Sequence, residues 1–326
     1  MFSSFLIAAT LLAADPAPPI VALTVTPDGS QLLTGSQSGV QVLSLPQLQP
    51  ADTIATKLEH VHKLTFSPRG DRLAIAGGSP GDRGTVEIWN WPERKLLTTL
   101  AAGSDLAYDA AWNAAGTRLA VAGADRAVRI LAANDTDGTP THRVSAPMPA
   151  TLRPHSAAVL ATLWLPAEDL VLSASVDQTI RLLNPASSAT IRSFENHTGP
   201  VRDLALRPGN SVGPPLVASA AADRTVRLWQ PTNNRLLRWA RLPVAPTAIC
   251  WTASGSHVLA ACEDGRLRAI DPDTVDVTEL AGQIDGWAYA VVALPDGKSA
   301  ALTGERGQLR IIALDAIVGN ALRGVP

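Results

Sequence analysis

The stretch that decides the fold runs from His197 to Pro231 and reads HTGPVRDLALRPGNSVGPPLVASAAADRTVRLWQP. Three short runs in it, apolar or alternating and separated by turn residues, predict three successive strands. These runs are Val201–Leu206, Leu216–Ala220 and Thr225–Trp229. One such sheet cannot bury both of its faces, so we expect the unit to repeat around a ring.

A turn of the kind seen in Phe66-Ser-Pro-Arg-Gly70 recurs along the whole chain. Proline presets φ at the first corner of such a turn, and glycine tolerates the positive φ that follows. The seven copies begin at Val25, Phe66, Trp112, Trp164, Leu206, Trp251 and Ala293, with spacings of 41, 46, 52, 42, 45 and 42 residues. A period of this size predicts a repeat architecture with one sheet per repeat.

The motif His-x-Gly-x-Val, followed by Ser-x-x-x-Asp-x-Thr-Val-x-Leu-Trp, resembles the WD-repeat family, although Trp229 precedes Gln230 where the family has Asp. The resemblance implies an all-β fold, a seven-bladed β-propeller of four-stranded antiparallel blades. We expect one such domain over residues 15–326, because a closed propeller of this length is a single domain.

The resemblance also implies a structural tetrad in the fifth repeat, formed by His197, Ser219, Asp223 and Trp229. A buried aspartate is costly unless it is hydrogen bonded, so we expect these side chains to form one network. The fourth repeat keeps part of the tetrad, with Leu183 in place of tryptophan; the retained residues are His155, Ser173 and Asp177. We interpret the tetrad as structural and expect no catalytic residues in it.

A second set of residues shares one repeat position near the start of the first strand, and the resemblance places it at the channel mouth on the top face. Its polar and aromatic members are His62, Tyr108, Arg202 and Tyr289. Tyrosine and arginine often anchor protein interfaces. We therefore expect another protein to bind here; the alternative is an exposed ring without a partner. Trp112, Trp164 and Trp251 share a different position, which predicts packing between blades.

Composition narrows the function classes. The chain has 27 Lys and Arg against 29 Asp and Glu, a net charge of −2, which argues against nucleic-acid binding through phosphate neutralisation. We find no motif of a nucleophile elbow, a phosphate loop or a metal site, and expect no cofactor. The sequence favours a non-catalytic interaction scaffold, monomeric outside its complex. The alternative is a propeller enzyme, of hydrolase or oxidoreductase type, with its site in the central channel.

The N-terminus is a separate piece. Phe5–Ala14 is an apolar run too short to span a bilayer, with small residues at its end. We interpret residues 1–14 as a signal peptide, although they lack a basic residue, and expect a mature chain without an integral membrane segment. The protein would then be exported, periplasmic or extracellular; without cleavage it would be cytoplasmic.

Three further expectations concern local structure. Cys250 and Cys262 fall in one predicted blade, where they form either a disulfide or two buried thiols. Asn134–Ser156 is expected to be a long solvated loop between repeats three and four. Ala316–Val325 is expected to supply the outer strand of the last blade, which would make every blade contiguous in sequence.

Overall fold

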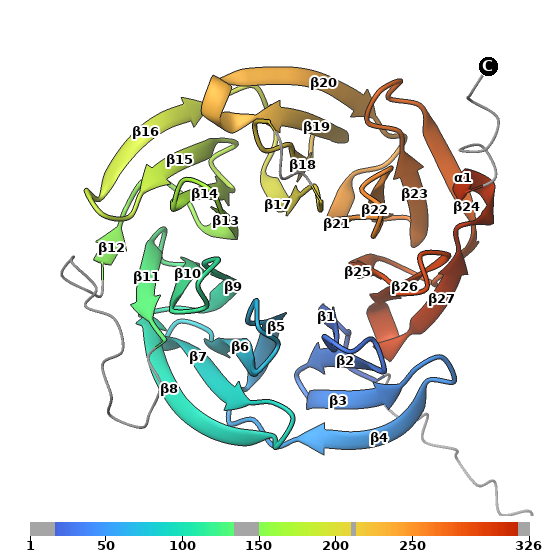
Figure 1. The fold of residues 1–326 in the computed structure, drawn as a ribbon, viewed down its shortest axis with the longest axis horizontal. Coiled ribbons are helices and arrows are strands. Elements are labelled where there is room, and N and C mark those ends of the chain that lie inside the picture. Colours follow the sequence, from blue (N-terminus) through green and yellow to red (C-terminus); the bar gives the residue numbers. More distant parts are fainter. Residues whose placement is uncertain (1–16, 134–149, 210–212, 319–326) are drawn as a thin grey trace, which may run out of the picture.

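The computed structural model describes residues 17–133, 150–209 and 213–318, and their regular structure is almost entirely β-strand. Seven antiparallel sheets stand around a central axis and form a closed ring (Figure 1). Each sheet is one blade, and its strands follow one another in the chain from the axis to the rim. The predicted seven-bladed propeller is confirmed, and within these ranges every blade is contiguous in sequence.

Blades one to three cover the first part of the chain. Blade one consists of β1 (Ala22–Val25), β2 (Gln31–Ser36), β3 (Gly39–Ser44) and β4 (Gln49–Ile54). Blade two consists of β5 (His60–Phe66), β6 (Arg72–Ser79), β7 (Arg83–Asn90) and β8 (Lys95–Gly103). Blade three consists of β9 (Ala107–Trp112), β10 (Arg118–Gly123), β11 (Val128–Ala132) and β12 (Ala150–Leu152).

Blades four to seven complete the ring. Blade four consists of β13 (Val159–Leu165), β14 (Leu170–Ser175), β15 (Ile180–Asn184) and β16 (Ala189–Phe194). Blade five consists of β17 (Val201–Leu206), β18 (Val217–Ala221), β19 (Thr225–Gln230) and β20 (Arg235–Arg241). Blade six consists of β21 (Pro246–Trp251), β22 (Val258–Cys262), β23 (Arg266–Ile270) and β24 (Val277–Gln283). Blade seven has three described strands, β25 (Ala288–Ala293), β26 (Ser299–Gly304) and β27 (Leu309–Ala313).

The hydrophobic core is divided into clusters between neighbouring blades. In one of them, Val226 and Leu228 of blade five pack with Ile249 and Trp251 of blade six. All five residues of β18 are buried, and they are small, because this strand is covered by a blade on each side. The rim strand β4 is exposed along most of its length. This gradient explains why the inner strands are apolar on both faces.

The recurrent turns connect the first and second strands of the blades. In the turn that ends at Gly29, the backbone N–H of this residue donates to the carbonyl of Thr26 at 2.8 Å. Five copies place glycine at nearly the same φ; they are Gly29, Gly70, Gly116, Gly255 and Gly297, with φ from 66° to 74°. Blade four uses Asp169 at a φ of 53° instead. These values confirm the prediction that the recurrent turn needs a residue that tolerates a positive φ.

The ends of the ring differ from the expectation. Ala316 does not begin an outer strand, because Asp315–Val318 forms a short helix, α1; residues 319–325 lie outside the described ranges. Ile317 of this helix is buried with Leu280 of β24, so the helical turn covers apolar surface at the rim. On the N-terminal side, the backbone N–H of Ile20 donates to the carbonyl of Gly304 in blade seven at 3.1 Å.

Two other expectations concern regions that are described only in part. The segment Asn134–Ser156 is not wholly a loop, because β12 lies within it and pairs Leu152 with Val128. β12 forms the rim strand of blade three. The interpretation of residues 1–14 as a signal peptide concerns residues outside the described ranges. Within those ranges, the structure contains no helix of the length and apolarity needed to cross a bilayer.

Candidate functional site

The four tetrad residues of blade five lie together between strands β17, β18 and β19. The imidazole Nδ1 of His197 is 2.8 Å from Asp223 Oδ2, and its Nε2 is 2.8 Å from Ser219 Oγ. The indole N–H of Trp229 donates to the same hydroxyl at 2.8 Å. Burial lowers the pKa of His197, which favours a neutral ring that donates to the carboxylate and accepts from the serine.

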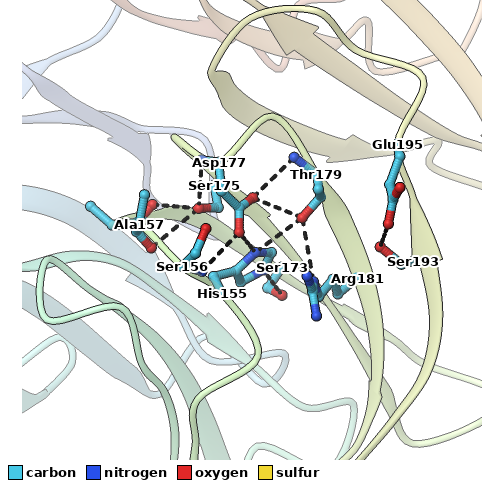
Figure 2. Close-up of polar contacts among 11 residues, drawn as sticks. His155, Ser156, Ala157, Ser173, Ser175, Asp177, Thr179, Arg181, Ser193 and Glu195 are labelled. Carbon is cyan, nitrogen blue, oxygen red and sulfur yellow. Dashed lines mark hydrogen bonds and ion pairs between the residues drawn. The ribbon is translucent and has the colours of Figure 1, made fainter.

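Blade four repeats this arrangement without the tryptophan (Figure 2). His155 joins Asp177 at 2.9 Å and Ser173 at 2.8 Å, and the Thr179 hydroxyl donates to Asp177 at 2.7 Å. Burial by itself would raise the pKa of Asp177. The hydrogen bond from Thr179 and the nearby His155 outweigh that effect and lower the pKa to about 2. This carboxylate therefore stays ionised and holds the turn before β15.

In both blades the serine, histidine and aspartate are hydrogen bonded in the same sequence of contacts as in a hydrolytic triad. The solvent accessibility of the serine distinguishes a structural network from a catalytic triad. Ser173 and Ser219 are both 0% exposed, so no substrate carbonyl can approach either hydroxyl. The hydroxyl of Ser219 also accepts the indole N–H of Trp229. The geometry therefore supports a structural network in these two blades rather than a nucleophile.

Other blades fill the same position with different chemistry. In blade three, Arg129 donates to Asp125 at 2.9 Å, and in blade six Arg268 donates to Asp264 at 2.9 and 2.6 Å. Each arginine lies four residues after its aspartate, as do Arg181 and Arg227 in the blades that have histidine. An arginine fork thus satisfies the turn carboxylate where histidine is absent.

Blade two uses a buried glutamate that we did not single out from the sequence. Glu87 is 1% exposed and accepts the indole N–H of Trp89 at 3.0 Å. It also accepts the Thr56 hydroxyl at 2.9 Å and the Lys57 backbone N–H at 3.1 Å. The signal was present, because Glu87 stands where the third strands of five other blades have arginine. Those residues are Arg129, Arg181, Arg227, Arg268 and Arg310.

The tryptophans at the end of the first strands pack between blades, as predicted. The indole N–H of Trp112 donates to the Thr65 carbonyl of blade two at 3.2 Å. That of Trp251 donates to the Ala205 carbonyl of blade five at 3.0 Å. An arginine of the preceding blade covers each ring at 5.0 to 5.5 Å from its centroid; the pairs are Arg72–Trp112, Arg118–Trp164 and Arg207–Trp251.

The residues that share the other repeat position line one cavity of about 360 Å³. The cavity lies where the first strands of the blades begin around the axis, and we call it the channel mouth. Its lining residues are Val21, His62, Tyr108, Leu160, Arg202, Thr247, Trp287 and Tyr289. The structure thus brings together the four predicted residues, from blades two, three, five and seven. It adds Trp287, which is 43% exposed and which the sequence reasoning missed.

An edge-to-face ring contact and an ion pair hold three of the side chains of the channel mouth. The His62 ring meets the Tyr108 ring edge-on at 5.2 Å, and burial lowers the pKa of His62 to about 4, so its ring is neutral at pH 7. Arg202 bridges two blades, since its guanidinium lies 2.8 Å from Glu263 and donates to the Pro246 carbonyl at 3.2 Å. The Arg202 guanidinium is therefore already paired with Glu263 and is not a free cation.

One residue further along three of these strands, the channel carries charges. Lys63 Nζ lies 3.0 Å from Asp109 Oδ1, and Asp109 Oδ2 accepts the Thr162 backbone N–H of blade four at 2.8 Å. Asp203 accepts the Ile249 backbone N–H of blade six at 2.8 Å. We call Lys63, Asp109 and Asp203 the channel charge cluster. It lines a cavity of about 190 Å³ that continues from the mouth.

The electrostatics of the cluster follow from this geometry. The Asp109 carboxylate raises the pKa of Lys63 above its ordinary value, so the ammonium stays charged. Burial raises the pKa of Asp203 to about 6, and the nearby Lys63 only partly offsets this. The sequence held a signal, because the equivalent position is alanine in the other blades: Ala22, Ala161, Ala248 and Ala290.

The two cysteines are free thiols. In the β21–β22 ladder Cys250 is opposite Leu259 and Cys262 is opposite Pro246, so the sulfurs are out of register for a disulfide. Cys262 is buried, whereas Cys250 is half-buried, so the expectation of two buried thiols is accurate for Cys262 and too strong for Cys250. Burial raises the pKa of Cys250 to about 12 and that of Cys262 to about 11, which makes both poor nucleophiles.

Comparison with known proteins agrees with the geometry. The family model "WD domain, G-beta repeat" matches residues 148–184 and 188–230, which contain the histidine networks of blades four and five. The chain is also 27% identical over 162 residues to Nuclear distribution protein nudF 1 of Talaromyces marneffei. That match covers 49% of this chain and 32% of the relative, so it spans about a third of the relative's length.

Proposed function

Because this chain is a β-propeller built from WD repeats, we propose that it is a non-catalytic scaffold that binds another protein at its channel mouth. Propellers of this family commonly serve as rigid interaction platforms. We propose only the class of partner, which is a protein with a surface complementary to the channel mouth. We further propose that the chain is a monomer until it binds.

The observation that carries the proposal is the convergence of aromatic side chains at the channel mouth. Tyr108 of blade three lines one cavity with Tyr289 and the 43% exposed Trp287 of blade seven. Folding does not require aromatic residues there, because the same repeat position is Val21 or Thr247 elsewhere in the ring. Rigid aromatic groups with polar atoms are the residues that most often anchor interfaces.

The rival class is a propeller enzyme with its site in the central channel. Its candidate groups are those of the channel charge cluster, and Asp203, with a pKa of about 6, is the best-placed acid or base. Each carboxylate of the cluster, however, accepts a backbone N–H of the next blade, which fits a role in holding the ring together. Because these carboxylates are already engaged in hydrogen bonds to the backbone, the geometry favours the scaffold over the enzyme.

The test is capture of a partner from the protein's own envelope fraction. The double variant Tyr108→Ala with Trp287→Ala should lose most of the captured partner, while its thermal midpoint stays close to that of the parent. Arg202 is left intact because removing it would also break the Glu263 ion pair between blades. The matched control is Ile191→Ala with Ile311→Ala, two exposed apolar residues on other strands, which should capture normally.

Two outcomes would count against the scaffold. Undiminished capture by the Tyr108 and Trp287 double variant would place the working surface elsewhere. Loss of a catalytic activity in Asp203→Asn, with capture unchanged, would favour the enzyme.

We also propose that the protein is exported. The support is the apolar run Phe5–Ala14 followed by Asp15-Pro16. N-terminal sequencing of the native protein should give a mature chain that begins near Ala14 or Asp15. Recovery of intact Met1 from the native protein would contradict export by cleavage.

A further inference from the structure

The rim strand of blade five differs in charge from the other rim strands. Between Asp223 and Glu263 the chain contains no acidic residue and five arginines, Arg224, Arg227, Arg235, Arg238 and Arg241. Three of these lie in β20, whose sequence is Arg-Leu-Leu-Arg-Trp-Ala-Arg. The other described rim strands, β4, β8, β12, β16 and β24, have at most one charged residue each. The basic charge is therefore a property of this blade.

The arginines and the tryptophan of β20 face solvent. Arg235, Arg238 and Arg241 are exposed, and Trp239 is 49% exposed. Within the described residues, neither Arg235 nor Arg241 forms an ion pair, and Arg238 interacts electrostatically with Asp271 of blade six. Most of this cationic surface is therefore available to a partner.

The backbone of β20 is also available along one side. The sheet of blade five ends at β20, which pairs only with β19, and the strand lies at the outer rim of the ring (Figure 1). Its outward N–H and C=O groups therefore present an open sheet edge, which can pair with an added strand. On one face of this edge, Trp239 is opposite Arg227 and Arg241 is opposite Thr225.

Charges on a rim strand can also serve to prevent unwanted pairing. That explanation fits the single charges of the other rim strands better than it fits β20. A strand protected only against association would not expose a tryptophan among its arginines, because the indole adds apolar contact area. The combination of an open edge, three arginines and an exposed indole indicates a surface that binds.

We propose that β20 docks an extended acidic segment of a partner protein, which adds to blade five as a fifth strand. Arginine forks bind carboxylates through paired hydrogen bonds, and the open edge supplies backbone hydrogen bonds that only a polypeptide matches. At about 3.3 Å per residue, β20 spans roughly 20 Å, which suits a segment of ordinary strand length. This surface lies at the rim, apart from the channel mouth, and does not depend on the function proposed for that cavity.

The experiment uses the full mature chain and a fluorescein-labelled synthetic peptide of about eight residues that alternates Glu and Val. Anisotropy titrations at low ionic strength should show saturable binding. The triple variant Arg235→Gln, Arg238→Gln and Arg241→Gln should raise the Kd by about tenfold to thirtyfold, which corresponds to about 1.4–2 kcal/mol for the three exposed pairs together. The control triple Arg69→Gln, Arg126→Gln and Arg310→Gln removes the same charge from other exposed sites and should bind nearly as the parent does.

Hydrogen exchange of the unmodified protein gives a second measurement that requires no variant. Bound peptide should slow exchange in Arg235–Arg241, and a peptide with Gln in place of every Glu should not. Equal loss of affinity in both triple variants, or protection confined to other strands, would overturn the proposal. So would β20-dependent binding of phosphatidylserine vesicles, of an oligonucleotide or of a second copy of the chain in preference to the peptide.

Discussion

At the scale of single residues, the tight turns before the third strands of blades three to six each contain an aspartate that must be hydrogen bonded. A carboxylate there is partly buried and needs donors, which His197 supplies in blade five and Arg129 supplies in blade three. The aspartates could be placed from their spacing alone. Only the structure showed which donor each of them uses, although each arginine stands four residues after its aspartate in the sequence.

The first prediction concerns Asp223. Asp223→Ala removes the acceptor of His197, Thr225 and the Thr198 backbone N–H. Leaving the buried His197 and Thr225 donors unsatisfied should lower the free energy of unfolding by about 1–3 kcal/mol. Denaturant titrations of the variant and the parent measure this. Asp273→Ala, at an exposed position, is the control and should change little. An unchanged stability of Asp223→Ala would contradict the structural interpretation of the tetrad.

At the scale of elements, the last residue of the second strand lies against the segment that leads into the first strand of the same blade. The size of that residue determines how closely the two segments can pack. Blade seven has Gly304 at this position, and a Cβ there would lie 2.0 Å from the Trp287 carbonyl oxygen. Blade five has Ala221 at the equivalent position, where the chain leaves room for the methyl group. The sequence pattern predicted that these strands exist. It did not predict how closely the segment before each first strand packs against the second strand.

The second prediction follows from this contact. Gly304→Ala forces the backbone near Trp287 to shift and should cost about 1–3 kcal/mol of stability. Because Trp287 lies at the channel mouth, the same change should also alter its fluorescence. The matched change Ala221→Gly creates no clash and should cost about 1–2 kcal/mol, through backbone entropy and the loss of a buried methyl group, without altering Trp287 fluorescence. Equal stabilities of Gly304→Ala and the parent would show that the entry segment yields freely.

At the scale of the whole molecule, closing the ring brings Lys63, Asp109 and Asp203 from three blades to one axis. The nearest two of them in sequence are 46 residues apart, so no local pattern predicts their contact. The ring also forces Asp203 into a site where burial raises its pKa to about 6. The stability of the ring should therefore depend on the protonation of this carboxyl.

The third prediction is the sign of that dependence. The ordinary pKa of the carboxyl is 3.8, so the folded chain holds the proton more tightly than the unfolded chain between 3.8 and about 6. Asp203 thus favours folding below this window and loses that contribution as the pH rises through it. Asp203→Asn lacks the titration, so its stability relative to the parent should increase from about pH 4 to about pH 7.

Unfolding free energies measured across this pH range test the prediction, and comparison with the parent removes the opposite trend of carboxyls such as Asp177. The exposed Asp285→Asn is the control and should follow the parent at every pH. A difference between Asp203→Asn and the parent that is constant with pH would show that Asp203 is well solvated in the channel.

The sequence alone determined the number of blades and, to within one residue, the first three strands of blade five, because turns and strand alternation are local properties of the chain. The tetrad of blade five followed from the family resemblance of its motif. The family resemblance of the motif placed His62, Tyr108, Arg202 and Tyr289 near the channel. Only the tertiary structure showed that Arg202 is paired with Glu263, that Trp287 joins the channel mouth and that a helix replaces the expected last strand. These features depend on contacts between blades, and residues far apart in the chain meet only when the ring closes.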